Sequence, residues 1–168
     1  MNSQSIAMSP ELVRLAEDLM VAIAFEELIR PTVVAYENEI LARLQLPVDP
    51  KFRESTSMTT IVDRNYAYML SEHDFQVFFT ECQTARVQNG LKVEQPDQCP
   101  LSIATGNRLA AEDAFLVEAF KLPEIQGKFK VETLTAEAKA ELIGLLLNQA
   151  APFLRSSSEI LKEISGDE

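Results

Sequence analysis

At 168 residues the chain has the length of one ordinary domain, and its 46% hydrophobic and 24% charged residues are typical of a folded protein with a buried core. Its 26 acidic and 15 basic residues give a formal net charge of −11. This charge opposes binding to nucleic acid or to an anionic membrane, because both need a cationic protein face. The N-terminal sequence lacks the basic and apolar segments of a signal peptide, and the most apolar run, residues 142–147, is too short to cross a bilayer. We therefore expect a cytoplasmic protein with no nucleic-acid and no membrane partner.

The first predicted helix begins at Ser9-Pro10-Glu11, which combines an N-cap residue, a proline in the first turn and an early acid. Apolar residues follow at helical spacing. Pro31 is expected to kink or end this helix, because proline lacks a backbone donor and crowds the preceding turn. The pattern then resumes and stops in the proline-containing loop at residues 46–50.

Residues 51–89 contain neither glycine nor proline and carry apolar residues at helical spacing. They form either one long central helix or two helices, the second capped by Ser71 with Asp74 three residues later. Asn89-Gly90 is a typical C-terminal stop.

Apolar periodicity predicts further helices at residues 101–121, 136–149 and 153–164. The sequence thus predicts an all-α fold, a helical bundle of about five to seven helices. We expect residues 1–168 to form a single domain, with residues 1–8 and 165–168 as flexible ends.

Two pairs of adjacent acids lie in apolar helical segments. Glu26 and Glu27 follow an apolar stretch of the first helix, and Glu112 and Asp113 lie in the alanine-rich helix that begins near residue 101. A carboxylate on a buried helical stripe is costly unless it is paired or binds a metal. Because hard cations accept oxygen ligands alone, these four acids on facing helices are candidate ligands for Mg²⁺ or Mn²⁺, with Glu72 as a further candidate. One alternative is therefore a Mg²⁺- or Mn²⁺-dependent hydrolase, or a metal-binding helical bundle.

The other interpretation of these acids is structural. In each pair, one acid would point to solvent and the other would meet Arg30, Arg86 or Arg108, as buried acids usually do. The chain also lacks the repeated Glu-x-x-His motif of ferritin-like di-iron proteins, since His73 is its only histidine and follows Glu72 directly. This argues against that type of metal site and favours the structural interpretation.

Few residues remain for catalysis at neutral pH. The chain has one histidine, two well-separated cysteines and no glycine-rich phosphate loop. The first helix and residues 51–89 carry more apolar residues than one buried face needs. We therefore expect a non-enzymatic helical protein without a cofactor that acts through protein–protein interaction or self-association, preferably as a homodimer. An acidic decoy that occupies a DNA-binding protein is a further alternative, supported only by the net charge.

Overall fold

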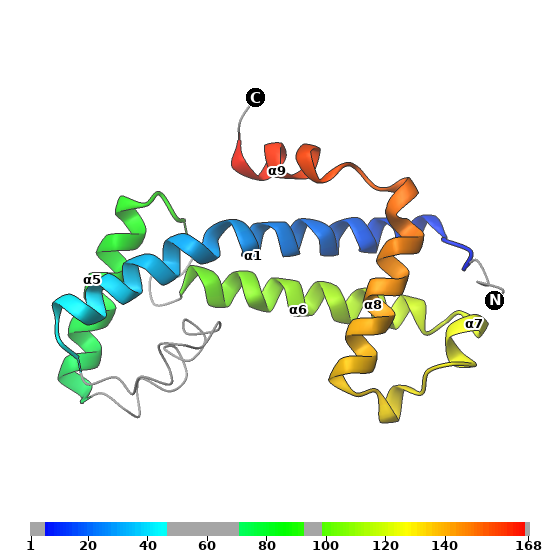
Figure 1. Ribbon diagram of the computed structural model, residues 1–168, viewed down its shortest axis with the longest axis horizontal. Helices are drawn as coiled ribbons and strands as arrows, with labels where there is room; N and C mark the ends of the chain where they lie inside the picture. The colour runs from blue at the N-terminus through cyan, green and yellow to red at the C-terminus, as the bar shows by residue number, and fades with distance from the viewer. Residues whose placement is uncertain (1–5, 47–70, 93–98, 167–168) are drawn as a thin grey trace. The chain divides into compact units, whose positions relative to one another are not determined.

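The computed structural model describes residues 6–46, 71–92 and 99–166, and these residues form six α-helices and two short 3-10 helices (Figure 1). The α-helices are α1 (Pro10–Arg43), α5 (Glu72–Gln88), α6 (Pro100–Ala119), α7 (Pro123–Gln126), α8 (Ala136–Ala150) and α9 (Ser157–Ser165). The 3-10 helices are η2 (Val131–Thr133) and η3 (Ala151–Phe153). These residues contain no strand, so the all-α prediction is confirmed, and six helices lie within the predicted five to seven.

No helix in the described part of the chain is both long enough and apolar enough to cross a membrane.

The chain divides by its internal contacts into two units. Unit 1 comprises Met1–Phe25 and Asn107–Glu168, and unit 2 comprises Glu26–Gly106. Helices α1 and α6 contribute residues to both units, and each unit has its own hydrophobic cluster. The expectation of a single domain over residues 1–168 stays a prediction.

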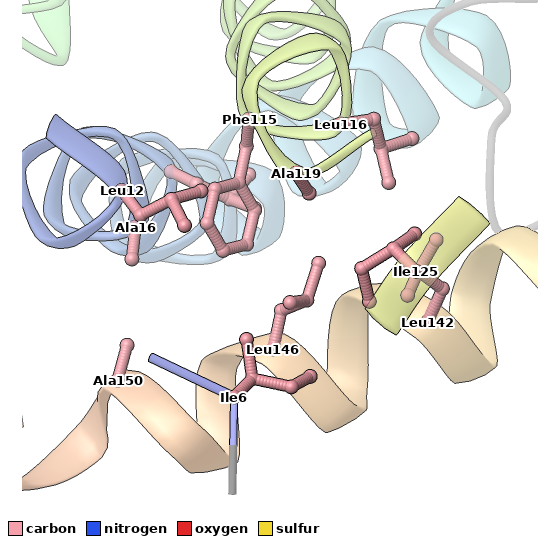
Figure 2. Close-up of a cluster of buried hydrophobic side chains, with 11 residues drawn as sticks. Ile6, Leu12, Ala16, Phe115, Leu116, Ala119, Ile125, Leu142, Leu146 and Ala150 are labelled. Atoms are coloured by element: carbon pink, nitrogen blue, oxygen red, sulfur yellow. The ribbon is translucent and has the colours of Figure 1, made fainter. Parts of the chain in front are cut away.

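The core of unit 1 is built from α1, α6, α7 and α8, whose apolar side chains gather in one cluster (Figure 2). Helix α8 contributes Leu142, Leu146 and Ala150, which lie four residues apart and therefore on one helical face. Fully burying a leucine stabilises a fold by about 1.5–3 kcal/mol, so this stripe holds α8 in place. Ile6 lies in the end that was expected to be flexible, yet it is buried in the same cluster. The other buried members are Leu12, Ala16, Leu19, Phe115, Leu116, Ala119 and Ile125.

The core of unit 2 joins the second half of α1 to α5 and to the first turns of α6. Phe78 of α5 is 1% exposed and is the largest of its fully buried side chains. Most of the other members come from α1 at spacings of three and four residues, as an amphipathic helix requires. The members from α1 and the turn that follows it are Ile29, Val33, Tyr36, Ile40, Leu41 and Leu46. Leu101 and Ala104 come from α6.

Pro31 was expected to kink or end the first helix, and the second alternative was wrong, because α1 continues through this proline to Arg43. Pro31 cannot donate a hydrogen bond to the carbonyl of Glu27, four residues earlier. Both residues are exposed, so water can reach the unsatisfied carbonyl. Apolar residues on the opposite face of α1 are buried both before and after Pro31. Their packing stabilises the helix on both sides of the proline.

The long-helix interpretation of residues 51–89 was also wrong. Ser71 has an extended ψ of 157°, and its hydroxyl accepts a hydrogen bond from the backbone N–H of Asp74 at 3.1 Å. Helix α5 therefore begins at Glu72, as the two-helix interpretation expected, while residues 51–70 lie outside the described residues. The predicted stop at Asn89-Gly90 is confirmed, with Gly90 in the left-handed region at a φ of 69°.

Candidate functional site

The first acid pair of the sequence lies on α1 in unit 2. Glu26 is only 5% exposed, and its carboxylate pairs with the guanidinium of Arg30, one helical turn later. Glu27 is exposed, because adjacent helical residues point about 100° apart. The structural interpretation expected this arrangement, with one acid paired and the other in solvent.

The second acid pair lies on α6 in unit 1 and follows the same pattern. Glu112 accepts a hydrogen bond from Arg108 at 2.6 Å. The Lys139 ammonium of α8 lies 3.6 Å from Glu112 and 3.4 Å from Asp113, whose side chain is 72% exposed. These contacts link α6 to α8 and place cations on both carboxylates.

The predicted metal ligands are thus divided between the units, with Glu26 and Glu27 in unit 2 and Glu112 and Asp113 in unit 1. Across the described ranges, no group of three or more His, Cys, Asp or Glu side chains is placed to hold a metal ion. The side chain of Glu72, the further candidate, lies outside the described residues.

Unit 2 also buries a polar group that the sequence analysis did not identify. Glu37 is 2% exposed, and the thiol of Cys99 donates to its Oε1 across 4.0 Å. Tyr36 beside it is buried among the apolar residues of the same cluster. Burial, followed by the nearby Cys99 and Glu37, raises the pKa of Tyr36 far above its usual range.

This buried group is better suited to packing than to catalysis. The raised pKa keeps the phenol of Tyr36 protonated at neutral pH, so it is not available as a base. The burial of Glu37 could have been predicted from the sequence, because it lies four residues after Val33 and four before Leu41 on the buried stripe of α1.

A third polar cluster lies on the surface of unit 1, where η3 leads into α9. The Arg155 guanidinium bridges Glu17 of α1 and Glu163 of α9. These two hydrogen bonds raise the pKa of Arg155, so it stays cationic at any pH at which the chain is folded. Glu17 and Arg155 are 138 residues apart, and no local sequence signal connects them.

The start of α9 is fixed by a complete capping box. The Ser156 hydroxyl accepts from the backbone N–H of Glu159 at 3.3 Å, and the Glu159 carboxylate accepts from the backbone N–H of Ser156 at 2.8 Å. Gly166 ends the helix with a φ of 71°, a left-handed conformation that glycine adopts without strain.

No known protein family, curated protein or solved structure matches this chain. The assignment of a function therefore depends on the arrangement of the residues described above.

Proposed function

We propose that this protein acts without catalysis, by packing its helices against another protein, and that its first partner is a second copy of itself. The observation that carries this proposal is the exposure of large apolar side chains in unit 1. Val117 and Phe153 are each 65% exposed. Further exposed apolar residues of this unit are Phe25, Leu109, Val131, Leu145 and Leu161.

Covering such side chains in a complex is favourable by roughly 25 cal/mol for each Å² of apolar surface that is removed from water. Aromatic side chains are especially effective, because they bury a large area with few rotatable bonds. Phe153 is the more exposed of the two exposed phenylalanines in unit 1, so we expect it to contribute most to an interface. In a homodimer with two-fold symmetry, the Phe153 side chains of both copies would be covered.

The acids support this proposal over the metal-dependent alternative. Glu26 pairs with Arg30, Glu112 pairs with Arg108, and Asp113 lies near Lys139. A divalent cation would have to displace these positive side chains before it could bind, which costs electrostatic energy. No specific observation favours the metal site, and the net charge of −11 opposes a nucleic-acid or anionic-membrane partner. A cytoplasmic location stays a prediction.

Size-exclusion chromatography with light scattering tests the proposal on the full chain. We expect a mass of twice the 18.8 kDa of one chain that dissociates on dilution between about 100 and about 1 µM. Phe153→Ser should raise the dissociation constant at least about tenfold, while Ser158→Ala on the exposed start of α9 should leave it unchanged. A mass of 18.8 kDa at every concentration would refute self-association.

A further inference from the structure

Helix α9 is attached to unit 1 outside its hydrophobic core. Ile160 is the single buried residue of α9 at 2% exposure, and it belongs to neither hydrophobic cluster. Figure 1 shows α9 next to α1, and Arg155 directly before α9 contacts Glu17 of α1. The surface of α1 around Glu17 therefore holds the start of α9, a short helix of the same chain.

The contacts that hold α9 in this position are few. A helix of nine residues is too short to persist alone in water, so it needs a surface to dock on. The polar contact of this segment with α1 is the ion pair of Arg155 with Glu17, which is partly exposed to solvent. Exposed ion pairs contribute little to the stability of a fold, and they mainly orient the segments that they join. Helix α9 can thus leave its site without disturbing the core.

The segment before α9 has the features of a hinge. It consists of the three-residue η3 and an extended stretch in which Leu154 and Ser156 have ψ values of 156° and 153°. Leu154 packs against the core of unit 1 and anchors the hinge there. Phe153 lies in this hinge and is 65% exposed, which is unfavourable for an aromatic residue in a single chain. If two hinges ran side by side, the Phe153 rings of the two copies would cover each other.

We propose that α9 is exchanged between two copies of the chain. In the exchanged dimer, α9 of each copy lies on α1 of the other, and Arg155 binds Glu17 of the partner subunit. The exchange is reciprocal and closes with two-fold symmetry, since the same two surfaces are used twice. This inference rests on the proposed self-association and adds to it the segment and the surface that mediate it.

A charge-swap mixing experiment tests the exchange on the full chain. Glu17→Arg and Arg155→Glu each break the ion pair in every closed monomer and every homodimer. When the two variants are mixed, only an exchanged heterodimer restores both pairs, since each α9 then meets an α1 of opposite charge. Arg155→Glu also replaces the contact with Glu163 by two facing carboxylates, but both groups travel with α9, so this cost does not depend on which α1 the helix meets.

Native mass spectrometry of the two variants after joint unfolding and refolding measures the heterodimer fraction. Random pairing gives one half, and exchange should raise this to roughly two-thirds to nine-tenths, given the usual strength of exposed ion pairs. The control is the pair Asp113→Arg and Lys139→Glu, which makes the same changes in net charge at a contact between α6 and α8. These helices are not exchanged, so this mixture should stay at one half.

The outcomes separate the two proposals. A heterodimer fraction of one half in both mixtures would overturn the exchange of α9 and leave self-association standing. Equal enrichment in both mixtures would trace the effect to net charge and would also overturn the exchange. Variants and wild type that are monomeric throughout would overturn both proposals. Circular dichroism of each variant checks that these surface substitutions preserve the helices.

Discussion

Glu26 offers the sharpest test of how the acids in the helices are used. Its side chain is 7% exposed and pairs with Arg30, whose side chain is 34% exposed. Removing one partner of a fully buried pair costs about 3–5 kcal/mol, and a surface pair contributes about 0–1 kcal/mol. Because Arg30 keeps some contact with water, we expect Glu26→Gln to lower the free energy of unfolding by about 2 kcal/mol, a loss typical of a hydrogen bond to a charged group.

Glu27→Gln is the matched control, since the same chemical change is made one residue away at an exposed position. It should alter stability by less than about 0.5 kcal/mol. In a chain of this length, a loss of 2 kcal/mol lowers the melting temperature by about 4–8 °C. Urea unfolding followed by circular dichroism measures both variants, and a double-mutant cycle with Arg30→Met isolates the energy of the pair. Equal midpoints for Glu26→Gln and Glu27→Gln would refute the reasoning.

The same variants address the metal-dependent alternative. We expect millimolar Mg²⁺ or Mn²⁺ to leave the melting temperature of the wild type unchanged, because Glu26 already has a cationic partner. A rise in the wild type that Glu26→Gln abolishes would identify Glu26 as a metal ligand instead.

Three further predictions concern other parts of the chain. Leu146→Ala should cost about 2–5 kcal/mol in urea unfolding and Leu145→Ala much less, because Leu146 is fully buried and Leu145 is 38% exposed; equal losses would contradict the described face of α8. Burial raises the pKa of Tyr36 in the folded chain, so above about pH 10 the unfolded chain loses this proton first and stability falls as the pH rises. Tyr36→Phe should make the urea midpoint fall less steeply between about pH 9 and about pH 11, and identical slopes would rule out this linkage. Ser156→Ala removes a cap worth about 1 kcal/mol, so hydrogen exchange should speed up several-fold in α9 and stay unchanged in α8, and unaltered exchange in α9 would show that the cap is dispensable.

Local signals predicted the ends of several helices. The cap at Ser71 and the stop at Asn89-Gly90 are both present in the structure. Each depends on hydrogen bonds within a few residues, so the sequence contains all the partners. Pro31 shows the limit of such signals, because whether a proline ends a helix depends on what the remaining residues pack against.

The acid pairs were predictable in part for the same reason. Glu26 with Arg30 and Glu112 with Arg108 are each four residues apart, a spacing that brings side chains together on any helix. The contact of Glu37 with Cys99, by contrast, joins two residues that are 62 positions apart in the chain. Its position on the buried stripe was visible in the sequence, but the group that it meets was not.

The sequence by itself determined that this protein is helical, where several helices begin and end, and which face of each is apolar, since all of these follow from neighbours within one or two turns. Only the tertiary structure decided that Arg155 meets Glu17, that Lys139 bridges to α6, and that Glu37 lies beside Cys99. The physical reason is that helical periodicity specifies the direction of a side chain but not the element that covers it. That element is chosen by packing between segments that are distant in the chain.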